Sequence, residues 1–281
     1  MVKIENLVKQ YDDFKLEINM QIKPGMVTGL VGRNGAGKST TIKAILGLIA
    51  PTSGSVKIFD VESKNFSCEL KNNIGVALAN TGFNSGLTIT AIARILKGMY
   101  KDFDKEDFFE KCRHYELPLN KEIKSFSTGM NARLRVLIAL CHNAKLLILD
   151  EPTSGLDVIA RNEVLDMLRE YLAEDSERSI LISSHISSDL EGLCDDIYMI
   201  HNGKIVLHED TDKLLGEYAL MKVNENQFGS LDKQYILSSK KENFGYSCFT
   251  NQKQYYKENY PDVVIENGNI DDLIIMMSEE K

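Results

Sequence analysis

A glycine-rich segment near the N-terminus combines residue types that bind phosphate. It reads Gly32-x-x-x-x-Gly37-Lys38-Ser39, and such glycines let backbone N–H groups turn toward an anion. At this spacing Lys38 can hold the β- and γ-phosphates of ATP, and Ser39 can ligate Mg²⁺. The pattern therefore predicts a P-loop with ATP and Mg²⁺ as ligands. The residues expected around the phosphates are Gly32, Arg33, Asn34, Gly35, Ala36, Gly37, Lys38, Ser39 and Thr40.

A second candidate group is the acidic pair Asp150-Glu151, which follows the apolar run 146–149. Ligands bind at the carboxyl ends of strands in open α/β sheets. Asp150 is placed to support Mg²⁺, through a water molecule, and Glu151 to polarise the water that attacks the γ-phosphate. Two solvated loop carboxylates are the alternative, and the P-loop upstream makes it the weaker one.

The flanking elements are those that a P-loop needs. An apolar run from Met26 to Val31 predicts a buried strand, and a helix is expected from about Lys38 to Leu48. A glycine-rich turn with a surface lysine would explain the glycines alone. The strand before and the helix after favour the P-loop.

The rest of the chain predicts an α/β fold: a P-loop NTPase core with an antiparallel β subdomain and a helical insert, plus a small C-terminal α+β appendage. Alternating residues within 2–22 indicate an antiparallel strand pair, and apolar spacings of three and four indicate helices between 88 and 142. Strands are expected at 145–149 and 179–183 around a helix at 159–173, and a hairpin at 197–207.

We expect a nucleotide-binding core domain at residues 1–218, with its helical subdomain at about 85–142, and an accessory domain at 219–281. The appendage has candidate strands at 235–239 and 263–266 and a last helix at 270–278. Its tyrosines could form a partner-binding face, but the core of the small domain is their more common use. These residues are Tyr255, Tyr256 and Tyr260.

Bulk composition narrows the classes of function. A net charge of -8 argues against a nucleic-acid partner, because such proteins concentrate Lys and Arg. Five cysteines without a CxxC pair indicate reduced thiols in a cytosol. The longest apolar runs are far shorter than the ~20 residues that span a bilayer, so no transmembrane segment is expected.

Two further segments carry a family resemblance. Ser125-Phe126-Ser127-Thr128-Gly129-Met130, followed by the segment from Leu147 to Asp157 with Asp-Glu-Pro-Thr-Ser-Gly-Leu-Asp, resembles the nucleotide-binding domain of ABC transporters. The resemblance covers residues 1 to about 215. It implies that Ser127 and Gly129 contact the γ-phosphate of ATP held by the opposite subunit. Read alone, Ser127 is the N-cap of a long helix.

The same resemblance implies three more site residues. Asp157, in a segment similar to the D-loop, would line the subunit interface, and His185 would be the switch histidine that contacts the γ-phosphate. Tyr11 matches the aromatic residue that stacks on adenine. Without the family, His185 would be a structural or exposed histidine at a strand end, and Tyr11 an exposed tyrosine near a hairpin turn.

The sequence departs from the family pattern at two places. Thr128 and Met130 replace the usual Gly and Gln of the signature. After the strand at 74–77, Ala79 and Asn80 stand where the family has a glutamine that touches Mg²⁺ and the attacking water. The alignment favours Ala79 at that position, which leaves a replacement by Asn80 open. Both features look similar to bacterial exporter ATPases with separately encoded membrane subunits, including antibiotic and peptide exporters.

The resemblance thus implies the ATP-hydrolysing motor subunit of an ABC transporter. It would act at the cytoplasmic face of the cell membrane, as a homodimer or heterodimer with a second ABC subunit, and drive export through a separate transmembrane permease. One alternative is a soluble ABC-type ATPase of DNA repair or translation. Another is a small-molecule phosphotransferase, which would leave residues 125–130 and 154–157 unexplained.

Overall fold

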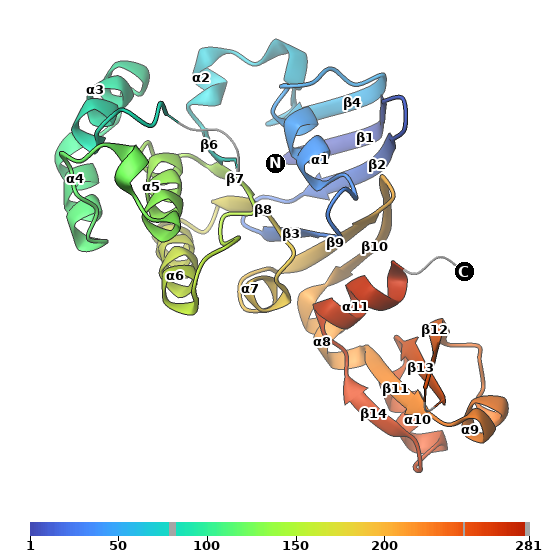
Figure 1. Cartoon of the computed structure of the whole chain (residues 1–281). Coiled ribbons are helices and arrows are strands. Elements are labelled where there is room, and N and C mark those ends of the chain that lie inside the picture. The colour runs from blue at the N-terminus through green and yellow to red at the C-terminus, as the bar shows by residue number, and fades with distance from the viewer. Residues whose placement is uncertain (79–82, 244, 279–281) are drawn as a thin grey trace.

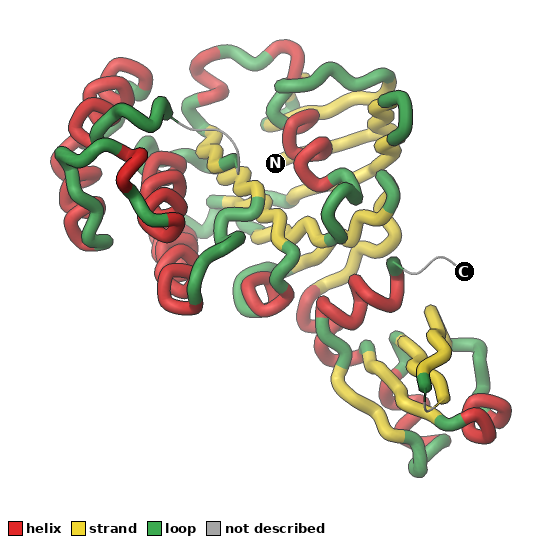
Figure 2. Tube along the Cα trace, in the orientation of Figure 1, coloured by secondary structure: helices red, strands yellow, loops and turns green. Residues whose placement is uncertain are grey.

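The computed structural model describes residues 1–78, 83–243 and 245–278, and in these residues the strands form two sheets (Figure 1). The large sheet has ten strands in the order β5-β4-β1-β2-β10-β9-β3-β8-β7-β6. Figure 2 shows helices gathered beside one end of this sheet and a separate small sheet near the C-terminus. The predicted α/β fold with a helical insert and a small appendage is confirmed.

The antiparallel part of the large sheet begins with the predicted strand pair. β1 (Val2–Gln10) pairs with β2 (Lys15–Ile22), whose residues alternate between exposed and buried. The sequence analysis missed β4 (Ser53–Ile58), which pairs with β1, and β5 (Val61–Glu62) at the edge. Only Val56 and Ile58 of β4 are buried, which is too short an alternation to stand out in the sequence.

The parallel part of the sheet positions the candidate site. β3 (Val27–Val31) lies between β8 (Ser179–Ser184) and β9 (Asp196–His201), and β7 (Leu146–Asp150) joins β8 to β6 (Ile74–Ala77). β10 (Lys204–Asp210) forms the predicted hairpin with β9. Because β3, β7 and β8 run in parallel, their carboxyl ends meet at one edge.

Helices cover both faces of the parallel part. The first, α1, spans Lys38–Ile45 and ends three residues before the predicted end, because Gly47 takes a left-handed conformation with φ of 68°. The predicted insert contains α3, α4 and α5, with Thr88, Asp104 and Ser127 as side-chain N-caps. The other bounds are α2 Cys68–Lys71, α3 Ile89–Met99, α4 Lys105–His114, α5 Thr128–Leu140, α6 Val158–Glu174 and α7 Ser187–Glu191.

The appendage is a four-stranded antiparallel sheet in the order β12-β13-β11-β14. Two of its strands coincide with the predicted ones, whereas β11 and β13, at its centre, were missed. The elements are α8 Thr211–Glu217, β11 Ala219–Val223, α9 Glu225–Ser230, β12 Ile236–Glu242, β13 Gly245–Thr250, α10 Lys253–Asn259, β14 Val264–Asn267 and α11 Ile270–Met277. The last helix, α11, returns to pack against α7.

The tyrosine cluster belongs to the core of the appendage, as predicted. Tyr256 is fully buried, and Tyr255 and Tyr260 pack against the same apolar cluster. All three hydroxyls bind Asp232: Tyr255 donates to its carboxylate at 2.9 Å, Tyr256 donates to its carbonyl at 2.6 Å, and Tyr260 accepts from its N–H at 2.8 Å.

Candidate nucleotide-binding site

The phosphate loop runs from the end of β3 to the start of α1 and is held closely by its neighbours. A Cβ on Gly32 would lie 2.2 Å from the carbonyl oxygen of Ile200, so a side chain does not fit there. Gly37 has φ of 120°, and a Cβ on it would lie 3.1 Å from the ring of Phe14. The loop is therefore fixed between β9 and the turn that joins β1 to β2.

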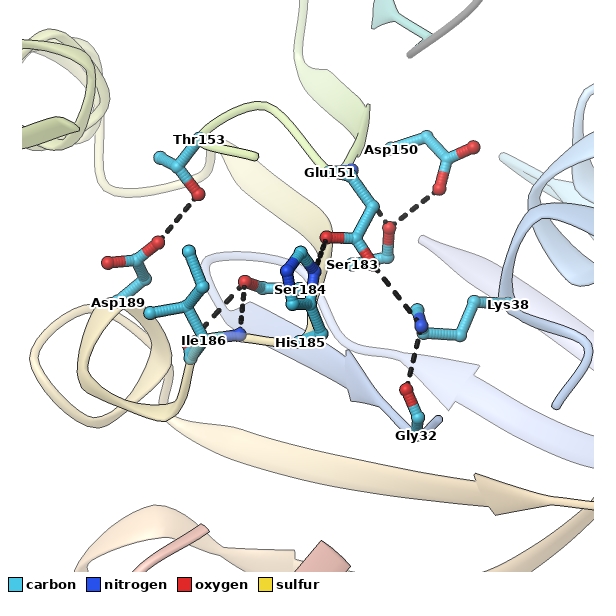
Figure 3. A network of polar contacts seen from close by, with 10 residues as sticks. All are labelled: Gly32, Lys38, Asp150, Glu151, Thr153, Ser183, Ser184, His185, Ile186 and Asp189. Carbon is cyan, nitrogen blue, oxygen red and sulfur yellow. Dashed lines mark hydrogen bonds and ion pairs between the residues drawn. The ribbon is translucent and has the colours of Figure 1, made fainter. Parts of the chain in front are cut away.

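Lys38 is a buried cation at the first position of α1. Its Nζ donates to the carbonyl oxygen of Gly32 at 2.7 Å and forms an ion pair with Glu151 Oε1 at 3.2 Å (Figure 3). A buried ammonium at the positive end of a helix strongly favours an anionic partner. A nucleotide phosphate fits this environment, because the Lys38 ammonium and the backbone N–H groups at the start of α1 are donors that an anion can accept from.

Glu151 sits at the end of β7 in a strained conformation. Its φ of 51° lies in the left-handed region, where non-glycine residues are uncommon and often functional. Its N–H donates to the carbonyl oxygen of Ser183 at 3.1 Å and to Ser183 Oγ at 3.0 Å. The same hydroxyl donates to Asp150 Oδ1 at 2.7 Å. Ser183 thus orients the carboxylate of Asp150 and fixes the backbone of Glu151.

His185 completes a chain of polar contacts across the strand ends. Its Nδ1 lies 2.5 Å from Glu151 Oε2, so the Glu151 carboxylate lies between Lys38 and His185 (Figure 3). Ser184 Oγ accepts from the N–H of Ile186 at 3.0 Å and shapes the turn that carries the imidazole. The fold therefore brings together Lys38, Glu151 and His185, which the sequence analysis had selected separately.

Ser127, Gly129 and Asp157 form a second group, at the start of two helices. Ser127 Oγ accepts from the N–H of Met130 at 3.2 Å, and Asp157 accepts from the N–H of Ala160 at 2.9 Å. A Cβ on Gly129 would lie 3.2 Å from the Cβ of Ala160, so the two helix starts are adjacent. α5 and α1 lie on opposite sides of β6 and β7 (Figure 1), so the two groups are separate in one chain.

The remaining predicted contacts lie around the loop. Tyr11 is 42% exposed at the end of β1, and its N–H donates to the carbonyl of Phe14, the residue that lies against Gly37. Ser39 is exposed beside Lys38, and Asp150 is buried. Arg33, Asn34 and Gly35 are exposed, Ala36 is buried and Thr40 is half-buried. Ala79 and Asn80 lie outside the described residues.

The described residues contain no group of three or more His, Cys, Asp or Glu side chains that could hold a metal. Mg²⁺ usually takes one or two protein oxygens and completes its shell with phosphates and water.

Comparisons with known proteins give the family. The family model described as ABC transporter matches residues 16–154. Bacitracin transport ATP-binding protein BcrA of Bacillus licheniformis is 38% identical over 212 residues, which cover 73% of this chain and 68% of that protein. Lantibiotic transport ATP-binding protein SrtF of Streptococcus pyogenes is 36% identical over 216 residues, which cover 75% and 92%. The chain belongs to the ABC transporter family.

A solved structure supports the assignment. An ATP-binding subunit of an ABC transporter superposes with a TM-score of 0.68 at 26% identity, covering 82% of this chain and 93% of that chain. The protein is thus an ABC transporter ATP-binding subunit and an ATPase that binds nucleotide, as predicted. Such subunits dimerise and work with membrane permeases. The relatives named here do not support the alternative role in DNA repair or translation.

No helix in the described part of the chain is long and apolar enough to cross a membrane.

The sequence analysis missed the residues that support this site. Besides Ser183, these are Thr153, whose hydroxyl donates to Asp189 at 2.6 Å, and Arg161, whose Nε lies 3.3 Å from the same carboxylate. Asp189 is only 1% exposed. An available signal was the pair Ser183-Ser184, two polar residues that follow the apolar run 180–182. Nothing local marks Asp189 as buried.

Proposed function

We propose that this ABC subunit is the motor of an exporter: two ATP-binding subunits hold MgATP between them, and its hydrolysis drives a separate transmembrane permease. One observation carries the proposal, the separation of the Lys38 group from the Ser127 group within the chain. The relatives named for bacitracin and lantibiotic transport support a role in transport. We also retain residues 1–218 as the nucleotide-binding domain, with the helical subdomain at about 85–142, and 219–281 as an accessory domain.

ATP binding would exchange the partners of Lys38. In this structure the ammonium donates a hydrogen bond to the carbonyl of Gly32 and forms an ion pair with the carboxylate of Glu151. A γ-phosphate competes with Glu151 for the same cation, because both are anions. Once released from Lys38, the Glu151 carboxylate is free to accept a proton from water and keeps its contact with His185. Tyr11 would stack on the adenine ring.

Ser39 and Asp150 would hold the metal. Their hydroxyl and carboxylate oxygens are the hard ligands that Mg²⁺ prefers. Bound Mg²⁺ neutralises the charge on the phosphate oxygens. Ser183 fixes Asp150 from the neighbouring strand through the 2.7 Å hydrogen bond, which keeps the carboxylate facing the end of the sheet.

The second group would act on ATP held by the partner subunit. The start of α5 offers an exposed serine hydroxyl, the N–H of Gly129 and the positive end of the helix dipole. Beside Asp157, Val158 is 63% exposed and Ile159 is 74% exposed. Exposed apolar side chains next to an anion site are expected where another protein surface covers them. A second copy or a close paralogue fits this surface.

The permease would dock in a groove of about 660 Å³ beside β6. Its walls are mainly apolar, and Leu48 and Met99 at the groove are exposed. β6 pairs along its length with β7, which ends at Asp150. A partner in the groove therefore touches a strand that is directly bonded to the strand carrying the catalytic acids, and this docking would place the subunit at the cytoplasmic face of the membrane.

A mixing experiment tests the shared site. Lys38→Ala removes the phosphate grip of one chain, and Ser127→Glu puts a carboxylate where the partner's γ-phosphate would bind. Each variant alone should hydrolyse ATP poorly. In a mixed dimer, one site has an intact Lys38 and an intact Ser127, so mixing the inactive variants should restore part of the turnover.

The matched control is Ser125→Glu, which adds the same charge two residues earlier and should hydrolyse ATP like the wild type. If a mixture of Lys38→Ala and Ser127→Glu chains is no more active than the separate chains, although mixed dimers form, the shared site is refuted. Cys68, the exposed cysteine of the five, lines the groove. A thiol reagent should label Cys68 less in the complex with the permease than in the free subunit.

A further inference from the structure

We propose that the C-terminal helix α11 is a positioning element for the ATPase site, which it reaches through the short helix α7. The inference rests on the roles proposed above for Glu151 and His185. It gives the appendage a part in turnover that the nucleotide contacts alone do not suggest. Four features of the structure carry it: a pair of hydrogen bonds between the two helices, an apolar contact, a buried carboxylate on α7 and the turn that leads into α7.

The first feature is that residues at the start of α11 form hydrogen bonds with both ends of α7. Ser187, the first residue of α7, donates its hydroxyl to Asp271 Oδ2 at 2.7 Å. Glu191, the last residue of α7, accepts from the N–H of Ile270 at 3.0 Å. Because Ile270 is the first residue of α11, its N–H has no acceptor within the helix. The Glu191 carboxylate also lies at the positive end of α11.

Apolar packing supports the same contact. Ile270 and Leu273 of α11 are fully buried and share an apolar cluster with Leu190 of α7 and Cys194 after it. The two helices pack against each other, and α7 also packs against β8 in the interior of the large sheet (Figure 1). Burial of these apolar side chains adds to the two hydrogen bonds in holding α7 and α11 together.

The inner side of α7 is tied to the segment that carries Glu151. Asp189 is almost fully buried and accepts from Thr153 Oγ1 at 2.6 Å, and it pairs with Arg161 at 3.3 Å. Thr153 is two residues after Glu151. A buried carboxylate that loses such partners is strongly destabilised, so a movement of α7 has to carry this segment with it.

The start of α7 is tied to His185 by the chain itself. His185 lies two residues before Ser187, and the hydroxyl of Ser184 fixes the intervening Ile186. Both partners of the 2.5 Å contact between His185 and Glu151 are therefore connected to α7. A misplacement of about 1 Å in such a pair can lower turnover as much as a hundredfold.

The test compares turnover with nucleotide binding in the full-length chain. Ser187→Ala and Asp271→Ala each delete one partner of the same hydrogen bond. We expect kcat to fall about three- to tenfold in each, with the KM for MgATP changed less than about twofold, because neither residue touches the phosphate grip. The double variant should be no slower than the slower single variant. Ser187→Thr keeps the hydroxyl and should restore kcat.

Ser188→Ala is the matched control, an exposed serine one residue along the same helix, and it should behave like the wild type. Glu151→Gln is measured in parallel. If Glu151→Gln stops turnover while Ser187→Ala and Asp271→Ala leave kcat unchanged, the positioning role is refuted and the proposed function stands. If kcat and thermal stability fall together and the KM for MgATP rises with them, the contact only stabilises the fold, which also refutes the proposal. Normal turnover of Glu151→Gln would instead refute the catalytic role on which it rests.

Discussion

The two groups expected to bind the γ-phosphate differ in how they are completed. In the Lys38 group, Lys38 is buried, Glu151 is half-buried and His185 is exposed, and the three side chains contact one another within the chain. In the Ser127 group, Ser127 and Asp157 are exposed, and within the described part of the chain their side chains bond to the first turns of their own helices. Tertiary folding assembles the first group, whereas the second is a surface ready for another molecule.

The physical reason lies in the cost of burying charge. Burying an ammonium without a counter-charge costs roughly several kcal/mol. Lys38 therefore needs Glu151 or a phosphate beside it. Ser127 and Asp157 act as helix caps and remain solvated, so they need no further partner to be stable. The contrast predicts that substitutions in the Lys38 group change ATP binding by the single chain. Substitutions in the Ser127 group should change turnover of the dimer and leave ATP binding by the single chain as it is.

The largest effect is expected for Glu151→Gln. The amide cannot take a proton from water, so turnover should fall about 10²- to 10⁴-fold. The P-loop and Lys38 still bind the phosphates, and the neutral amide no longer competes with them for Lys38. An ATP-bound dimer should therefore accumulate, which light scattering would detect. Glu177→Gln, at an exposed position, is the control. A monomer at saturating ATP, or turnover near wild type, would contradict the role of Glu151.

A smaller effect is expected for Lys38→Ala. Losing a charge-assisted contact of about 1.5–3 kcal/mol should weaken ATP binding roughly ten- to a hundredfold. Titration with a fluorescent nucleotide measures this in the monomer. Lys43→Ala, an exposed lysine later in α1, should bind as the wild type does. Equal affinities for the Lys38 variant and the wild type would remove the main support for the phosphate site.

Ser127→Ala should sharpen the contrast between the two groups. Turnover should fall about tenfold, within the range for the loss of one donor to a phosphate and one helix cap. ATP binding to the monomer should stay unchanged, because Ser127 is remote from Lys38. Ser125→Ala serves as the control. Weaker binding of ATP to the monomer would mean that the two groups meet within one chain.

The smallest effect is expected where the family glutamine is replaced. Asn80→Ala should leave turnover unchanged, and Ala79→Gln should raise it by restoring an oxygen ligand near Mg²⁺. Both positions lie outside the described residues, so the expectation rests on the sequence alone. It is wrong if Asn80→Ala lowers activity, or if a structure with MgATP places the Asn80 oxygen at metal-ligand distance, ~2.1 Å.

The cysteines show which properties the local sequence predicts and which depend on the fold. Five scattered thiols predict reduced cysteines, but only the fold separates them. Burial raises the pKa of Cys112 and of Cys141 to about 12 and that of Cys248 to about 11, whereas Cys68 is exposed. The same limit applies to strands: the apolar run of β7 is evident from sequence, while β11 and β13 depend on pairing with each other.

The sequence by itself determined the P-loop, the acidic pair, the N-cap Ser127 and the main strands and helices around the site, although it missed β4, β5, β11 and β13. These features depend on neighbouring residues, through periodicity, glycine content and capping side chains. Tertiary structure alone decided that Glu151 lies between Lys38 and His185, that Asp189 is buried, and that α11 returns to α7. These contacts join segments far apart in the chain, because β3, β8 and β7 lie side by side in the sheet and the local sequence does not encode that order.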